Sequence, residues 1–339
     1  MVKYVFMKRI TTSQVAAAAG VSVGAASVVL NGGTKKIGVS EKTRARILEA
    51  ARKLGYRINP AARATRTGKF GAVALLLSHV DRNSLVPGSR LSCILDATEK
   101  HNLSLTLTRA SDANLSDEQY LRNLLTRIYV DGLLIGYNAE LPPLFVQLLT
   151  RLRIPSVWIN AKLNQNAVYP DDRSAARELT EKFIASGFKD IVFVNNKGDS
   201  HYSFFDRKEG YEDAMSAQEL KPKVISARED DECHVFSDQF SDQFDARHPR
   251  RVFICYSNLH AAAVISAAQS LGQTPGKDFR IATFSNRPET ICGYRIPCAI
   301  INENLLTEEA VSLLLKRIES PTEDFPSVSV PYATVTDSV

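Results

Sequence analysis

The chain of 339 residues lacks several features that mark common classes of protein. It has one tryptophan, and its five cysteines are scattered, odd in number and never in C-x-x-C spacing. This pattern argues against a disulfide framework or a zinc site and fits reduced thiols in the cytoplasm. No apolar run reaches the ~18 residues of a membrane-spanning helix, and no long apolar stretch follows the N-terminal bases as in a secretory signal. We therefore expect no association with a membrane.

The common signatures of catalysis are also missing. The sequence contains no G-x-x-x-x-G-K-[ST], no H-E-x-x-H, no G-x-S-x-G and no G-x-G-x-x-G after a strand. Its six histidines are dispersed. We expect no catalytic residues, no cofactor and no metal. A content of 44% hydrophobic and 23% charged residues instead indicates a globular chain, and its length suits two or three domains.

Charge is distributed very unevenly along the chain. Residues 1–69 carry 14 Lys and Arg against 2 acidic residues, a balance of +12, whereas the remaining 28 basic and 35 acidic residues give −7. A small basic head on a mildly acidic body is typical of a nucleic-acid-binding module attached to another domain.

Three helices are expected in residues 8–57. Thr11 and Gln14 form a capping box before an apolar run that Gly20 ends. Ser22 caps a second helix, and Ser40 caps a third that the sequence predicts over residues 40–54. Two short helices joined by a turn with glycine predict a helix-turn-helix DNA-binding domain.

Residues 58–69 predict a linker. Asn59 and Pro60 favour the start of a helix, but the segment has almost no apolar surface and is too short to be a stable helix alone. We expect it to become helical only against a partner.

The head carries a family resemblance in the motif T-x-x-Q-V-A-x-x-A-G-V-S-x-x-x-x-S-x-x-L-N-G and the later G-V-S-x-x-T-R-x-x-I-L-x-A-A-x-x-L-G-Y-x-x-N-P-x-A-R. These residues resemble the lactose-repressor family of bacterial transcription regulators. The resemblance implies a second helix in the major groove, a hinge helix in the minor groove and a homodimer on a pseudo-palindromic operator of double-stranded DNA. It places the chain in the cytoplasm, on the nucleoid.

The resemblance also implies the residues that contact DNA. The residues that contact phosphates or stabilise the head are Thr11, Ser22, Ser27, Asn31, Thr43, Tyr56 and Asn59. The base-reading positions are Val23, Gly24 and Val28. The hinge residues are Ala62, Arg63 and Thr65. Val28 departs from the polar side chains frequent in relatives, because it cannot donate a hydrogen bond to a base. Thr65 stands where relatives have a leucine wedge, so we expect weaker bending of the duplex.

Residues 70–335 alternate short apolar runs with amphipathic stretches, from the run at 71–77 to the one at 280–284. Such alternation predicts doubly wound parallel sheets. The cycle restarts after Asp172, so we expect two lobes with a cleft at the carboxyl ends of their strands. The family's body is likewise built of two lobes that resemble periplasmic sugar-binding proteins and hold a small-molecule effector between them.

Weaker matches in the body imply effector-facing positions, namely Trp158, Asn160, Arg207, Asn258 and Ser285. The sequence predicts a helix over residues 207–218 that Arg207 opens. A surface ion pair remains the alternative for Arg207, and plain core the alternative for Trp158. Leu259 and Ser285 stand where relatives have acids, which leaves less carboxylate to balance Arg207. The sequence thus predicts an effector that is sugar-like or anionic, a sugar acid or sugar phosphate.

Two functions from different classes remain open on this evidence. One is a transcription regulator, usually a repressor, controlled by an effector in the cleft between the lobes. The other is a ligand-binding module or enzyme of the periplasmic-binding-protein type with an incidental basic head. The capped helix-turn-helix and the hinge at Asn59 and Pro60 favour the regulator.

Overall fold

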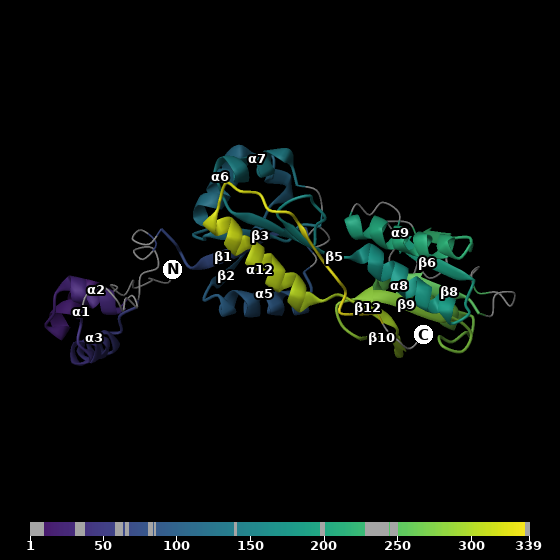
Figure 1. Cartoon of the computed structure of the whole chain (residues 1–339), viewed down its shortest axis with the longest axis horizontal. Helices are drawn as coiled ribbons and strands as arrows, with labels where there is room; N and C mark the ends of the chain where they lie inside the picture. The colour runs from purple at the N-terminus through teal and green to yellow at the C-terminus, as the bar shows by residue number, and fades with distance from the viewer. Residues whose placement is uncertain are drawn as a thin grey trace, which may run out of the picture. The chain divides into compact units, whose positions relative to one another are not determined.

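The structure is a computed structural model, and it describes residues 10–30, 38–57, 64, 68–80, 84, 86–138, 141–196, 201–227, 244 and 250–335. The chain divides into two compact units, Met1–Gly71 and Ala72–Val339, which are called the head and the body below. The head begins with the helices of the predicted DNA-binding domain. The body holds two parallel sheets (Figure 1).

The described residues of the head include the helices α1 (Thr12–Ala19), α2 (Val23–Leu30) and α3 (Glu41–Leu54). The predicted capping box is present, because the Thr11 hydroxyl accepts from the backbone N–H of Gln14 while the Gln14 side chain accepts from the backbone N–H of Thr11. Gly20 and Gly55 end α1 and α3 with φ of 60° and 65°. This left-handed conformation suits glycine, which has no Cβ.

Small side chains form the core of the head and let its helices approach closely. The Thr12 and Tyr56 hydroxyls, 3.0 Å apart, tie the start of α1 to the residues after α3. The buried residues of this core are Val15, Ala16, Ala19, Ala26, Val29, Leu30, Ile47, Ala50 and Ala51.

The first lobe of the body is a parallel sheet with strand order β13-β5-β4-β3-β1-β2. Its strands are β1 (Ala72–Ser78), β2 (Ser104–Ala110), β3 (Gly132–Ile135), β4 (Ser156–Ile159), β5 (Ala167–Pro170) and β13 (Val328–Val330). The α-helices that pack on it are α5 (Gly88–Lys100), α6 (Glu118–Arg127), α7 (Pro143–Arg151) and α12 (Glu303–Glu319), and a short helix η2 (Asp112–Asn114) follows β2. One buried cluster joins the sheet to α5 and α12, and a second joins it to α6 and α7.

The second lobe repeats the same plan with strand order β14-β12-β9-β8-β6-β7. Its strands are β6 (Ile191–Asn196), β7 (Lys223–Ala227), β8 (Val252–Cys255), β9 (Arg280–Ser285), β12 (Cys298–Ile300) and β14 (Thr334–Val335), with a hairpin of β10 (Glu289–Ile291) and β11 (Tyr294–Ile296). Its helices are α8 (Asp172–Ala185), α9 (Tyr202–Ala217) and α11 (Asn258–Ser270). Among the described strands of this sheet, only β14 runs antiparallel to its neighbour.

The predicted fold class is confirmed, but the path of the C-terminal segment was not foreseen. After β12 the chain returns to the first lobe, where α12 packs beside α5 (Figure 1) and β13 joins the edge of the sheet. It then crosses again to form β14. Because α12 also carries many polar residues, its sequence does not show that it packs on the first lobe, where Leu306, Ala310 and Leu314 are buried.

No single helix within the described ranges is long and apolar enough to cross a membrane. The helices α1 and α2 pass that test only as a pair, and they are bent by 110° at the break between them.

Candidate DNA-binding surface and effector site

The start of α2 presents an exposed face. Val23 is 50% exposed and Gly24 is also exposed, whereas Ala26, Val29 and Leu30 are buried in the head core. This alternation follows the helical period. The Ser22 hydroxyl accepts from the N–H of Ala25 at 3.2 Å, so it fixes the first turn of this face.

The other predicted DNA contacts have distinct settings. Ser27 and Val28 are half-buried. Thr11 is exposed and belongs to the capping box, the Thr43 hydroxyl bonds that of Ser40 at 3.0 Å, and Tyr56 packs against the core. The predicted contacts Asn31, Asn59, Ala62, Arg63 and Thr65 lie outside the described residues.

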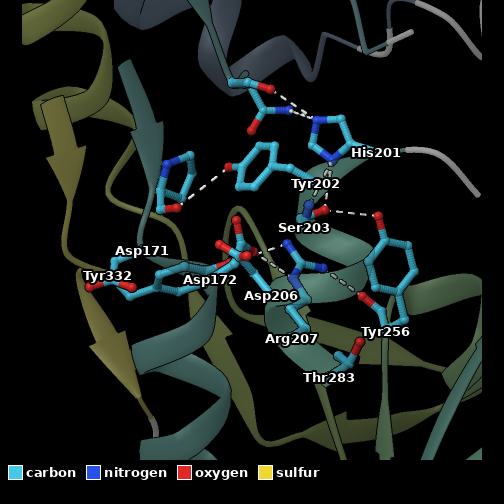
Figure 2. Close-up of polar contacts among 12 residues, drawn as sticks. Asp171, Asp172, His201, Tyr202, Ser203, Asp206, Arg207, Tyr256, Thr283 and Tyr332 are labelled. Carbon is cyan, nitrogen blue, oxygen red and sulfur yellow. Dashed lines mark hydrogen bonds and ion pairs between the residues drawn. The ribbon is translucent and has the colours of Figure 1, made fainter. Parts of the chain in front are cut away.

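Arg207 is the centre of a buried polar cluster in the second lobe (Figure 2). Its Nε donates to Asp172 at 2.6 Å, Nη1 to the Tyr256 carbonyl oxygen at 2.6 Å, and Nη2 to the Tyr332 hydroxyl at 3.1 Å. The Tyr332 hydroxyl also donates to Asp172, at 2.7 Å. The guanidinium carbon lies 4.4 Å from the centre of the Phe284 ring, within the range of a cation–π contact.

The charges of this cluster stabilise one another. Burial disfavours the charged form of Arg207, but the interactions of its guanidinium, of which that with the Asp172 carboxylate is the strongest, together raise the pKa of Arg207 above its usual value. Burial also raises the pKa of Tyr332, so its hydroxyl stays protonated and can donate. Nearby, burial and the Arg207 charge lower the pKa of His260 to about 4.

Two steps of the sequence argument about Arg207 are wrong. First, Arg207 does not open a helix, because α9 begins at Tyr202 with His201 as its cap and Arg207 lies in the second turn. Second, the guanidinium is not short of carboxylate, since Asp172 supplies an ion pair at 2.6 Å. The argument for an anionic effector therefore loses its premise.

Polar contacts also join the two lobes. The backbone carbonyl of Asn160, in the first lobe, lies 2.9 Å from Nε2 of His201, in the second. Lys162 donates to both carboxylate oxygens of Asp206, at 2.8 and 2.7 Å. Any ligand that enters between the lobes must replace or rearrange these contacts.

The remaining predicted effector residues lie in two separate parts of the body. Asn258 and Ser285 lie together beside the Arg207 cluster, with Asn258 Nδ2 donating to Ser285 Oγ at 3.3 Å. The Oδ1 atom of Asn258 is buried and has no hydrogen-bond partner among the described residues. Trp158 instead lines a cavity of 660 Å³ in the first lobe, whose lining includes neither Arg207 nor Asn258.

Sequence reasoning missed Asp172 and Tyr332 as partners of Arg207. Asp172 follows Asp171 in the D-x-R stretch at the start of α8, so adjacent acids at the restart of the fold were an available signal. Tyr332 is 160 residues away from Asp172 and had no local signal. Among the described residues, no group of three or more His, Cys, Asp or Glu is placed to hold a metal ion.

Comparison with known proteins agrees with this arrangement. Residues 11–59 match the model of bacterial regulatory proteins of the lacI family, and residues 180–338 match a periplasmic binding protein-like domain. The chain belongs to the lacI family. As a member of it, the chain is a DNA-binding transcription regulator rather than an enzyme.

Full-length similarity to other lacI-family proteins supports this assignment. The chain is 25% identical to catabolite control protein A of Priestia megaterium, over 95% of this chain and 97% of that protein. It is 26% identical to the ribose operon repressor of Halalkalibacterium halodurans, over 95% of this chain and 94% of that protein. The match to the regulator RegA of Clostridium saccharobutylicum is 28% identical but spans only 61% of each chain.

Solved structures share the same lacI-family fold. A lac repressor dimer bound to operator and the anti-inducer ONPF aligns with a TM-score of 0.78 and 18% identity, over 97% of this chain and 98% of that one. A complex of the regulator CelR with cellobiose aligns with a TM-score of 0.60 and 20% identity, over 96% of this chain and 98% of that one.

Proposed function

We propose that this protein is a cytoplasmic repressor that binds a pseudo-palindromic operator as a homodimer and responds to a small molecule between its lobes. In this proposal residues 8–57 are the DNA-binding domain, 58–69 the hinge, and 70–335 the effector-binding and dimerisation domain. Two heads on a two-fold symmetric dimer would require paired half-sites in the DNA.

The observation that carries the DNA-binding part of the proposal is the first turn of α2. Its exposed residues Val23 and Gly24 stand on a helix whose other side is anchored in the head core. Ser22 caps that helix, and the N-terminus of a helix favours the phosphates of DNA. The +12 balance of residues 1–69 supplies the attraction.

The contacts between the lobes support control by an effector. Asn160 and Lys162 of the first lobe meet His201 and Asp206 of the second, and Arg207 lies one residue after Asp206. A ligand that binds one lobe arrangement more tightly shifts the protein toward it. The names of the relatives, a ribose operon repressor and a cellobiose-bound regulator, favour a sugar-like molecule.

Fluorescence anisotropy with duplexes from the region upstream of the gene tests DNA binding. We expect Val23→Glu to weaken binding by about tenfold or more, because it adds a negative charge at the proposed DNA face. Leu48→Glu is the matched control, since Leu48 in α3 is 48% exposed and not a predicted contact. Equal affinity of the two variants would contradict the assignment of α2.

Release of that DNA by a panel of neutral sugars, sugar acids and sugar phosphates tests the effector part. We expect one class to weaken DNA binding by the wild type. A panel in which no compound alters DNA affinity, with binding to DNA intact, would leave the DNA-binding proposal standing and overturn a sugar-like effector.

A further inference from the structure

The start of α9, in the second lobe, makes two polar contacts with the first lobe. Nε2 of His201, the cap of α9, lies 2.9 Å from the carbonyl oxygen of Asn160. Because a carbonyl oxygen only accepts hydrogen bonds, Nε2 carries the proton and donates. Further along α9, both carboxylate oxygens of Asp206 accept from Lys162, at 2.8 and 2.7 Å. The pairs Asn160–His201 and Lys162–Asp206 are called the catch below.

The backbone of Asn160 is shaped for its part of the catch. Its φ is 64°, in the left-handed region that residues other than glycine rarely adopt. Its N–H donates to the carbonyl oxygen of Val168 in β5 at 2.8 Å, which anchors the residue in the first lobe. Its side-chain Nδ2 also lies 3.3 Å from Nε2 of His201. Both polar groups of Asn160 therefore meet the same ring nitrogen of the second lobe.

The first turns of α9 also hold two segments by which the chain crosses between the lobes. Where β5 leads to α8, the Tyr202 hydroxyl donates to the carbonyl oxygen of Pro170 at 3.4 Å, and Arg207 donates to Asp172 (Figure 2). Where β13 leads to β14, Arg207 donates to Tyr332. A rotation of one lobe against the other about these segments would therefore strain α9 and the catch together.

The catch lies where an effector would bind. Asn160 and Arg207 are proposed effector contacts, and in this structure His201 bonds the first while Asp172, Tyr256 and Tyr332 bond the second. Lys162 and His201 line the same 660 Å³ cavity as Trp158. The protein's own groups thus occupy the polar contacts that an effector needs.

The ion pair of the catch is strong enough to bias the lobes and weak enough to open. The Lys162 side chain is 42% exposed and that of Asp206 is 11% exposed, so water partly screens their attraction. Loss of an ion pair in such a setting should shift the ratio of closed to open lobes by about fivefold or less. A ligand with a moderate preference for open lobes can supply that difference.

We propose that the catch is an autoinhibitory contact, which holds the lobes together without ligand and must open before an effector enters. The proposal rests on the proposed function, because it takes the effector site to lie between the lobes. In it, Lys162 and Asp206 control access to the site, and the effector displaces His201 from Asn160.

Quenching of Trp158 emission by acrylamide tests the proposal on the full chain, without DNA or effector. Trp158 is the sole tryptophan, is half-buried and lines the same cavity as Lys162, so its emission reports the opening of the lobes. Lys162→Glu sets two carboxylates against each other and should raise the quenching constant by about twofold or more. Asp206→Lys, which sets two ammonium groups together, should do the same.

The double variant Lys162→Glu with Asp206→Lys restores an ion pair of reversed sense, so its quenching constant should return close to that of the wild type. Lys208→Glu is the matched control, because Lys208 lies on α9 but pairs with Glu212 of the same helix. It should leave the quenching constant unchanged. Circular dichroism checks that every variant folds.

Two results would overturn the catch. One is a quenching constant that neither single variant raises above that of Lys208→Glu. The other is a double variant that stays as strongly quenched as the single ones, since a lost fold or a local change near Trp158 would then explain the effect. Because the measurement needs neither DNA nor an effector, either result leaves DNA binding and the effector to the experiments above.

Discussion

At the scale of single residues, Arg207 has two roles that an experiment must separate. It is a proposed effector contact, and it neutralises Asp172, whose side chain is 1% exposed. A variant that loses Arg207 therefore leaves a buried carboxylate without its ion pair. Loss of an effector response in such a variant is informative only beside a measurement of stability.

We predict that Arg207→Ala lowers the free energy of unfolding of the body by about 3–5 kcal/mol, the usual effect of removing one partner of a buried ion pair. Arg173→Ala is the matched control, because Arg173 is 49% exposed and pairs with Asp213 on the surface. Its loss should cost far less, because an ion pair that water surrounds contributes little to stability. Urea unfolding followed by circular dichroism measures both, and similar midpoints for the two variants would contradict a structural role for Asp172–Arg207.

His260 predicts a dependence of stability on pH. Burial and Arg207 lower its pKa in the folded body to about 4, below the usual value of 6.5. Between pH 4 and pH 6.5, His260 is therefore protonated in the unfolded chain but neutral in the folded chain. The contribution of His260 to the free energy of unfolding, which is fully present above pH 6.5, is lost as pH falls toward 4. The loss reaches roughly 3 kcal/mol for one group.

Unfolding at a series of pH values tests this in wild type and His260→Gln. The variant should show a shallower loss below pH 6.5, whatever its stability at neutral pH. His101→Gln, at an exposed position, should keep the wild-type slope. Parallel curves for all three proteins would show that His260 does not carry the effect.

At the scale of elements, capping residues made the helices of the head predictable. Thr11, Gln14, Ser22 and Ser40 are local signals, and each makes the bond expected from the sequence. The start of α9 was missed because histidine is an uncommon cap: Nδ1 of His201 accepts from the N–H of Ser203, at 3.4 Å. As a result, the sequence predicted Arg207 as the first residue of the helix, whereas it lies in the second turn of α9.

The packing of α9 on α8 depends on Gly210. A Cβ at this position would lie 2.1 Å from the backbone oxygen of Arg173, so the two helices could not keep their distance. We predict that Gly210→Ala destabilises the body by about 2 kcal/mol or more and displaces Arg207 from Asp172. Gly88→Ala in α5 is the control, because its Cβ would meet open space. Thermal unfolding should separate the variants, and equal melting temperatures would contradict this close approach.

At the scale of the whole molecule, the alternation of strands and helices predicted two lobes, because that pattern is local to each βα unit. The return of α12 and β13 to the first lobe depends on contacts between distant parts of the chain, such as the buried pair of Arg90 in α5 with Glu303 in α12. Single-sequence periodicity does not report such contacts. The same limit hid Tyr332, and with it the full set of partners of Arg207.

The uneven charge of the chain predicts how it binds DNA. Residues 1–69 supply 14 basic residues, while the base-reading positions Val23, Gly24 and Val28 carry no hydrogen-bonding side chain. Affinity should then come mainly from phosphates, and each neutralised phosphate releases counterions. We predict that affinity for the upstream duplex falls by about 10³-fold or more between 50 and 200 mM salt.

An unrelated duplex of equal length is the control for this prediction. Because phosphate contacts do not depend on sequence, the slopes of log affinity against log salt for the two duplexes should agree within about one unit. Val28→Arg adds a side chain that can bond guanine, so it should change which sequence is preferred and steepen both slopes by at most about two units per dimer. A wild-type affinity for the upstream duplex that hardly changes with salt would instead mean that Val23 and Val28 bind base edges strongly through apolar contacts.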